Sequence, residues 1–274
     1  MKMAQVSPFL RWAGGKTWLI KQFHLLMGNI QINHYHEPFL GGAAAFFSLD
    51  MRKKSYLSDA NAELINTYKT IKDYPQEVIH GFQSLINSEE QYYLIRAAKP
   101  QNEIEQASRF IYLNQTSYNG LYRVNRQGDY NVPYGFRESM VYDANRILLA
   151  SQKLKNTNIS QGDFTVNKYK IRQGDLVFLD PPYTVSHNNN GFIEYNQELF
   201  SLDDQYRLSK FVDYIKKKHA YYILTNAAHS TVKDIFDKGD RILELDRHSL
   251  IGGKNAERKK ITEYVFTNIT EGDK

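Results

Sequence analysis

The fold of this chain is decided by one stretch, Asp175-Leu176-Val177-Phe178-Leu179-Asp180-Pro181-Pro182-Tyr183. Its first half is a short, apolar, partly β-branched run, which predicts a buried strand over residues 175–179. The two prolines then stiffen the chain where it leaves the strand, because each fixes φ and neither has an N–H to donate. The sequence therefore predicts that the Asp180 carboxylate and the Tyr183 ring face outward at the carboxyl end of the strand.

The quartet from Asp180 to Tyr183 carries the groups that a planar amino nitrogen requires. The lone pair of such a nitrogen, for example N6 of adenine, is delocalised into its ring. It therefore needs acceptors for its two protons and a stacking surface for its base. Asp180 and the Pro181 carbonyl can accept, and the Tyr183 ring can stack. Taken alone, the same four residues also fit an ordinary loop.

Composition narrows the classes of protein to consider. A length of 274 residues suits one sizeable domain or one domain with an insertion. We expect a soluble protein, because no apolar run approaches the length of a bilayer span and the first residues lack a secretory signal. The absence of cysteine excludes disulfides and thiolate chemistry. A net charge of +5, a pI near 9.0 and 20 tyrosines favour a nucleic-acid partner, since basic residues contact phosphates and aromatic rings stack on bases.

Strand and helix patterns alternate at both ends of the chain, which predicts a doubly wound α/β fold. The expected strands are residues 35–39, 54–57, 175–179, 220–225, 242–245 and 262–266, and the expected helices are 43–51, 203–217 and 231–236. The intervening stretch has a polar, mainly helical pattern that ends in a hairpin over residues 119–133, with its turn near Gln127-Gly128-Asp129. We therefore predict a discontinuous α/β domain, residues 1–61 and 144–274, interrupted by an inserted domain, residues 62–143.

The segment Glu37-Pro38-Phe39-Leu40-Gly41-Gly42-Ala43 joins an expected strand to an expected helix. A glycine at such a turn lets a ligand approach the backbone closely, and the N–H groups that open a helix suit a carboxylate or a phosphate. Asp59 lies 18 residues beyond Gly41 at the end of the next strand, near the spacing at which an acid meets ribose hydroxyls in α/β folds. The pair predicts a cofactor that contains adenosine.

The N-terminal segment Gly14-Gly15-Lys16-Thr17 offers a competing interpretation as a phosphate-binding P-loop. That motif requires a glycine five residues before Gly15 and a strand ahead of it. Residue 10 is leucine and no apolar strand precedes it, so the sequence argues against an ATPase or GTPase.

Together these motifs resemble the Dam-type (D12 class) DNA adenine-N6 methyltransferases. The resemblance runs in order from about residue 8 to 269 and also includes Phe9-Leu10-Arg11-Trp12-Ala13-Gly14-Gly15-Lys16 and Leu57-Ser58-Asp59-Ala60-Asn61. It implies a Rossmann-like domain that uses S-adenosylmethionine and no metal, and a DNA target-recognition domain in the insertion. Ala43 stands where the family commonly has a glycine.

The resemblance also implies roles for individual residues. The catalytic residues would be Asp180, Pro181, Pro182 and Tyr183. The cofactor-binding residues would be Trp12, Lys16, Glu37, Pro38, Phe39, Gly41, Asp59, Asp163, Phe164 and Asp180. The DNA-binding residues would be Leu121, Arg123, Asn125, Pro133, Arg247, Arg258 and Lys260, although the basic segment that holds the last three also fits a solvated loop. The block from Tyr118 to Pro133 resembles enzymes that methylate GATC.

The expected reaction is methyl transfer from S-adenosylmethionine to N6 of a flipped adenine in duplex DNA, with S-adenosylhomocysteine as the product. We expect a cytoplasmic monomer of bacterial or phage type, without a membrane or an obligate protein partner. One alternative is a methyltransferase for another planar nitrogen, in RNA or in a protein glutamine; the glutamine enzymes typically have Asn where this chain has Asp180. The other is a catalytically silent DNA-binding relative, which the intact motifs argue against.

Overall fold

The computed structural model describes residues 6–50, 53–138, 143–183, 200–248 and 260–270. Within them the chain is a mixed α/β protein with a seven-stranded sheet. It divides into two compact units: unit 1 contains residues 1–20 and 40–166, and unit 2 contains residues 21–39 and 167–274. Helix α1 (Thr17–Met27) contains the point at which the chain passes from unit 1 to unit 2.

Unit 1 has a parallel pair of strands, β2 (Ser55–Asp59) and β3 (Thr157–Gln161). Their register runs from Ser55 opposite Thr157 to Asp59 opposite Gln161, so both strands end at the same edge. The sequence did not predict β3. Its five residues include one strongly apolar side chain, Ile159, so the sequence lacks the alternation of apolar and polar residues that marks a strand.

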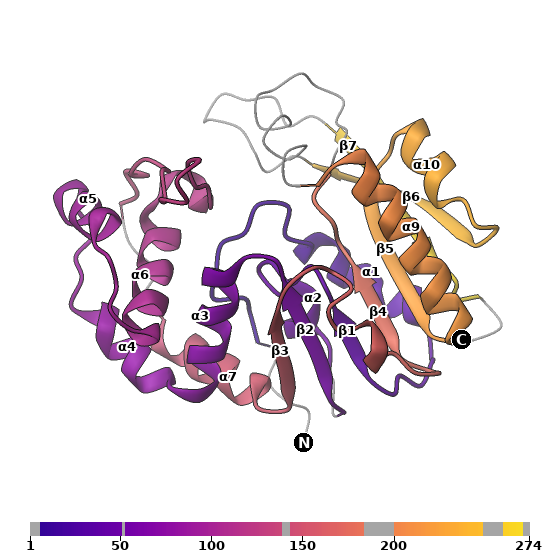
Figure 1. The fold of residues 1–274 in the computed structure, drawn as a ribbon, viewed down its shortest axis with the longest axis horizontal. Coiled ribbons are helices and arrows are strands. Elements are labelled where there is room, and N and C mark those ends of the chain that lie inside the picture. Colours follow the sequence, from indigo (N-terminus) through magenta and orange to yellow (C-terminus); the bar gives the residue numbers. More distant parts are fainter. Residues whose placement is uncertain (1–5, 51–52, 139–142, 184–199, 249–259, 271–274) are drawn as a thin grey trace. The chain divides into compact units, whose positions relative to one another are not determined.

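Helices make up most of unit 1 (Figure 1). They are α2 (Ala44–Ser48), α3 (Ala62–Asp73), α4 (Pro75–Gln83), α5 (Glu89–Ala97), α6 (Glu103–Thr116) and α7 (Ala144–Leu154), with a 3₁₀ turn, η1 (Tyr118–Gly120). Four of them begin after a side chain that accepts a hydrogen bond from the first helical turn: Asn61, Ser88, Asn102 and Asp143. Helix α6 packs against α3, α4 and α5 and so forms the centre of this group.

Many of the tyrosines belong to the core. Tyr92, Tyr112, Tyr130 and Tyr134 form a cluster with Leu113 and Val132, and most of these side chains lie on α5, α6 and the segment that follows η1. Burial raises the pKa of Tyr130 to about 12. Tyr35, Tyr68 and Tyr222 are also completely buried. The abundance of tyrosine that suggested base stacking is therefore partly an aromatic core.

Unit 2 has five strands in the order β1 (Tyr35–Glu37), β4 (Leu176–Leu179), β5 (Tyr221–Ala227), β7 (Lys260–Thr267) and β6 (Arg241–His248). Strands β1, β4 and β5 are parallel, whereas β7 runs antiparallel to both β5 and β6. Helix α9 (Leu202–Lys217), which begins with a capping box, packs against β5 and α10 (Ser230–Phe236), and η2 (Lys168–Lys170) precedes β4. All four residues of β4 are buried, as its apolar sequence predicts.

The predicted elements overlap the observed ones in both units. Helix α2 is shorter than predicted, because Leu49 has an extended backbone. The predicted hairpin is present as an isolated antiparallel bridge between Val124 and Tyr130, with the N–H of Gly128 donating to the carbonyl of Asn125 at the turn. The assignment of residues 62–143 to a separate inserted domain stays a prediction.

Candidate active site

Asp59 connects the ends of several segments in unit 1. One oxygen of its carboxylate accepts the N–H of Gly41 at 3.0 Å, and the other accepts the N–H of Asn61 at 3.0 Å. The backbone carbonyl of Asp59 accepts the N–H of Gly162 at 3.0 Å. Burial raises the pKa of the Asp59 carboxyl, although the N–H groups of Asn61, Gly41 and Ala60 act in the opposite direction. Asp59, the residue predicted to bind the ribose hydroxyls, therefore lies beside the predicted glycine turn and the segment after β3.

The glycine turn is tightly packed around Trp12. A Cβ atom on Gly41 would lie 2.8 Å from the indole, and one on Gly42 would lie 2.8 Å from the Trp12 Cβ. The carbonyl of Gly41 also accepts the Tyr68 hydroxyl at 2.9 Å. Ala43, at the end of the turn, has φ 54°, a left-handed conformation in which glycine would be unstrained.

Trp12 also contacts the segment that follows η1. Its ring is stacked on that of Tyr122, with centroids 6.1 Å apart and planes 21° apart. The Tyr122 hydroxyl donates to Glu63 at 3.0 Å, and Glu63 pairs with Arg109 at 3.6 Å. Within unit 1, Trp12 of the N-terminal motif is thus in direct contact with the glycine turn and with Tyr122 of the block from Tyr118 to Pro133, the predicted recognition block.

Two other predicted cofactor residues of unit 1 have different surroundings. Lys16 is buried just before α1, and its Nζ donates to the Gly14 carbonyl at 3.0 Å. Phe164 is buried, whereas Asp163 is exposed and accepts both the N–H and the hydroxyl of Thr165, at 3.1 and 2.7 Å. Asp163 therefore holds its own turn together beside the Asp59 backbone.

The predicted residues of β1 lie in unit 2. Glu37 is buried and accepts the hydroxyl of Tyr35 at 2.8 Å. Burial raises the pKa of Tyr35 far above its ordinary value, and the charges of Glu37 and Asp180 add to this effect. The electrostatic influence of Asp180 thus reaches the Tyr35–Glu37 pair. Pro38 is buried, and Phe39 meets Phe200 edge-on with centroids 5.6 Å apart.

The predicted catalytic quartet begins directly after β4. Asp180 is half-buried, and its Oδ1 accepts the hydroxyl of Thr225, a buried residue of β5, at 2.7 Å. Tyr183 is half-buried, and its hydroxyl donates to Glu263 of β7 at 2.5 Å. Pro181 is buried and Pro182 is half-buried. Neighbouring strands thus hold the first and the last side chain of the quartet.

The predicted DNA-binding residues fall into two sets. In unit 1, Arg123 is exposed and donates to the Asn131 side chain at 2.7 Å and to its carbonyl at 3.2 Å. The Asn125 side chain instead accepts the N–H groups of Gln127 and Asp129, so it shapes the turn. The carbonyl of Leu121 accepts the Tyr130 hydroxyl, and that of the exposed Pro133 accepts the N–H of Tyr118.

The second set is basic and lies near the end of the chain. Arg247 is opposite Ile261 in the β6–β7 ladder, and Lys260 is opposite His248. Arg258 lies outside the described residues.

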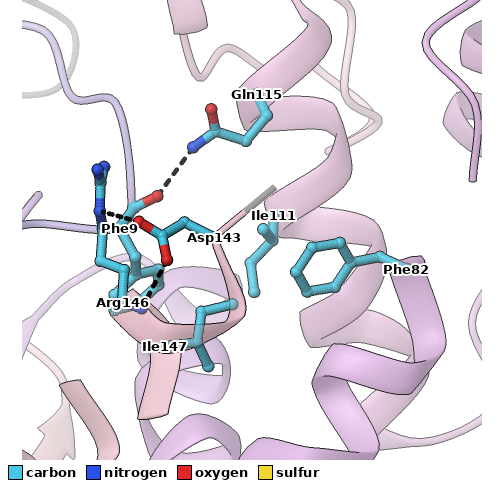
Figure 2. A pocket seen from close by; sticks show the side chains of 7 residues that line it. All are labelled: Phe9, Phe82, Ile111, Gln115, Asp143, Arg146 and Ile147. Atoms are coloured by element: carbon cyan, nitrogen blue, oxygen red, sulfur yellow. Dashed lines mark hydrogen bonds and ion pairs between the residues drawn. The ribbon is translucent and has the colours of Figure 1, made fainter. Parts of the chain in front are cut away.

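Unit 1 also contains a pocket apart from these predicted residues (Figure 2). It is lined by Phe9, Phe82, Ile111, Gln115, Asp143, Arg146 and Ile147. Its polar side chains bond within the unit: Gln115 donates to the Phe9 carbonyl at 2.8 Å, and Arg146 pairs with Asp143 at 3.4 Å. The pocket therefore marks where the N-terminal segment joins α6 and α7.

Comparison with known proteins assigns the chain to a family. The profile of the family described as D12 class N6 adenine-specific DNA methyltransferase matches residues 12–250. The chain belongs to this family. Type II methyltransferase M1.LlaDCHI of Lactococcus lactis is 34% identical over 96% of this chain and 95% of its own length. Type II methyltransferase M.MjaIII of Methanocaldococcus jannaschii is 34% identical over 96% and 99%, and DNA adenine methylase of Escherichia coli K12 is 27% identical over 96% and 95%.

Membership of the D12 class confirms the predicted enzyme class, an adenine-specific DNA methyltransferase, and implies the use of S-adenosylmethionine. Among the described residues there is no group of His, Cys, Asp or Glu that could hold a metal ion. None of the described helices has the length and apolar character needed to cross a bilayer.

The sequence did not indicate three residues that contact predicted site residues. Thr225 contacts Asp180, Glu263 contacts Tyr183, and Tyr122 contacts Trp12. Thr225 and Glu263 lie in strands β5 and β7, where the sequence pattern indicates only a sheet. Their contacts depend on strand order, which the sequence does not contain. Tyr122 directly precedes Arg123 in the predicted recognition block, and this position beside a predicted site residue was the sequence signal that could have identified it.

Proposed function

We propose that this protein transfers a methyl group from S-adenosylmethionine to N6 of an adenine that is flipped out of duplex DNA. The observation that carries the proposal is the placement of Asp180 at the end of β4, with its Oδ1 held by the Thr225 hydroxyl at 2.7 Å. A carboxylate accepts more than one hydrogen bond, so Asp180 can still accept from an amino group. The flipped base is exposed on both faces, and the Tyr183 ring supplies a stacking surface.

The chemistry follows from these acceptors. Asp180 and the Pro181 carbonyl orient the two amino protons, so that the nitrogen lone pair turns toward the incoming methyl group. The sulfonium of S-adenosylmethionine, when bound, makes that methyl group electrophilic. The amino proton would become acidic only as N6 gains the methyl group and the methyl–sulfur bond breaks to release S-adenosylhomocysteine. Asp180 would then accept this proton, so it need not be a strong base. Alignment of the reacting groups then supplies much of the rate, and no covalent enzyme intermediate is required.

The residues of unit 1 fit an adenosine-containing cofactor. Asp59 is half-buried and fixed by two backbone N–H groups, and its remaining lone pairs can accept ribose hydroxyls. Asp163, beside it, can accept from the adenine amino group, and Phe164 can cover the ring. Trp12, Lys16 and the Gly41 turn would hold the methionine part. For Glu37, Pro38 and Phe39 the proposed cofactor role is supported by the family membership.

We propose that residues 62–143 recognise the DNA target and that the target is GATC. Arg123 supports this, because its exposed guanidinium can bond N7 and O6 of guanine together, whereas adenine presents a donor at that place. Arg247, Arg258 and Lys260 would contact phosphates. We infer that the protein acts as a cytoplasmic monomer.

The deciding experiment measures transfer of labelled methyl groups to duplex DNA with and without a GATC site, single-stranded DNA, RNA and protein. We expect N6-methyladenine in the GATC duplex, identified by mass spectrometry of nucleosides. Label in RNA or glutamine would favour the other planar nitrogens, and no label on any substrate would favour a silent DNA-binding protein. Methylation of a duplex that lacks GATC would reject GATC as the target sequence but would leave the proposed reaction unchanged.

A substitution tests how the target is read. Arg123→Ala should reduce discrimination at one guanine by about 1–3 kcal/mol, with a smaller loss on other bases. Arg126→Ala is the matched control, because Arg126 is exposed in the same turn. Equal weakening on every DNA sequence would make Arg123 a backbone contact.

A further inference from the structure

Glu263 lies within the sheet of unit 2 and contacts the last residue of the catalytic quartet. Its side chain is completely buried, and its Oε2 accepts the Tyr183 hydroxyl at 2.5 Å. In the ladder, Glu263 is opposite Ala227 of β5 and Leu245 of β6. Side chains at paired positions share a face of a sheet, so the carboxylate stands in a row with two apolar neighbours.

A carboxylate in this place is not explained by stability alone. Removing a carboxylate from water costs several kcal/mol, and a hydrogen bond recovers part of that cost. Even whole buried ion pairs can often be replaced by apolar residues of similar volume without loss of stability, so buried charge contributes little to stability. A leucine would match the apolar neighbours Ala227 and Leu245 without the desolvation cost of a carboxylate.

The bond to Glu263 has a direct consequence for the Tyr183 ring. Pro181 and Pro182 restrict the backbone that leads to Tyr183, but they leave its side-chain torsions free. The hydroxyl is the far end of the ring, so its bond to Glu263 fixes the end that the backbone does not. Small displacements of groups that hold a substrate reduce rates strongly, because the reacting atoms must be aligned.

We propose that Glu263 is a positioning residue for methyl transfer: by accepting the Tyr183 hydroxyl, it fixes the ring on which the target base stacks. The inference rests on the proposed function, in which Tyr183 stacks on a flipped adenine. Glu263 itself does not touch the base, and it acts only through Tyr183.

The test compares Glu263→Leu, Tyr183→Phe and the double variant. Each single variant should lower the single-turnover methylation rate about tenfold, as expected for the loss of one hydrogen bond to a charged group. The double variant should be no slower than either single one, because both changes delete the same bond. Glu263→Gln, which keeps an acceptor oxygen, should retain most of the methylation rate of the unchanged protein. Stability of Glu263→Leu to urea should equal or exceed that of the unchanged protein, which a purely structural role would not give.

Tyr222→Phe is the matched control. Its hydroxyl donates to Asp240 at 2.8 Å, so it is likewise a tyrosine bonded to a carboxylate, but it lies near the start of β5 and on the opposite face of the sheet from Thr225. This variant should leave the methylation rate unchanged.

Additive losses in the double variant, or a full rate in Tyr183→Phe, would overturn the inference. If Glu263→Leu does not fold, Tyr183→Phe and Glu263→Gln still decide the question. Failure of the proposed function is a separate result, because then the unchanged protein would place no methyl group on adenine N6.

Discussion

The two ends of strand β4 carry the same side chain in different settings. Asp175, just before the strand, is completely buried, and its carboxylate accepts the backbone N–H and Nδ1 of His34, Nε2 of His36 and the N–H of Arg172. Asp180, just after the strand, is half-buried and is held through Oδ1 by Thr225. A carboxylate surrounded by donors and closed to water fixes the chain, whereas one that reaches solvent can bind a ligand.

The carboxyl end of β4 gives the largest expected effect. Asp180→Ala should lower single-turnover methylation of duplex DNA about 10²- to 10³-fold, or about 2.7–4 kcal/mol, because it removes the acceptor that the proposed function uses in the transition state. Asp180→Asn, which keeps one acceptor oxygen, should lose less. Circular dichroism and cofactor binding should match those of the unchanged protein. A rate for Asp180→Ala within about tenfold of that of the unchanged protein would show that Asp180 is not the principal acceptor.

The opposite end of β4 should respond in stability instead. Asp175→Ala leaves the buried ring donor of His36 and the part-buried backbone N–H groups of His34 and Arg172 without their acceptor, which should lower the free energy of unfolding by about 3 kcal/mol. Urea denaturation measures this loss. Methylation per folded molecule should stay within a few-fold of normal. A strong loss of activity in fully folded Asp175→Ala would erase the contrast between the two ends.

A smaller effect should follow from the residue that holds Asp180. Thr225→Val keeps the shape but removes the hydroxyl bond, so it should slow methylation about fivefold, or about 1 kcal/mol. Thr267→Val is the control, because the buried Thr267 hydroxyl donates to the Tyr222 carbonyl at the other end of the same pair of strands. Equal slowing in both variants would point to a general effect on the sheet.

The smallest effect is a dependence of stability on pH from Asp175 and His36. Burial raises the pKa of Asp175, but hydrogen bonds from His36, the Arg172 backbone and His34 outweigh it, so the pKa lies below its ordinary value. Burial also lowers the pKa of His36, although Asp175 opposes this. In both cases the unfolded chain binds more protons, so stability falls as the pH is lowered. The contribution of His36 is lost as the pH falls below about 6.5, and that of Asp175 as it falls below about 4.

The measurement is urea denaturation of the unchanged protein and His36→Gln as the pH is lowered from 7 to 4. Glutamine can still donate to Asp175 but does not titrate, so the variant should lose less stability between pH 7 and 5. Identical pH profiles would show that His36 contributes nothing to this dependence.

The same comparison shows what the sequence can predict. Strand β4 and the quartet were predictable, because an apolar run and its exit lie within nine consecutive residues. The glycine turn and Asp59 were predictable from their spacing, and they are joined by a hydrogen bond. Thr225 and Glu263 were not, because they reach the quartet only after β5 and β7 take their places in the sheet.

Strand β3 and the tyrosines mark a second limit. The β3 sequence is too polar for its pattern to stand out, and pairing with β2 gives it its place. The high tyrosine content suggested base stacking, yet Tyr92 and Tyr112 belong to one buried cluster in the core. Composition counts side chains without showing which of them folding buries.

The packing of Trp12 makes it an optical probe. The chain has two tryptophans, Trp12 and Trp18, and Trp12 lies between the glycine turn and the Tyr122 ring. With Trp18 replaced by phenylalanine, all indole fluorescence comes from Trp12. Its emission then reports on the two surfaces that it contacts, and it allows events at the turn and around Tyr122 to be followed in real time without an added dye.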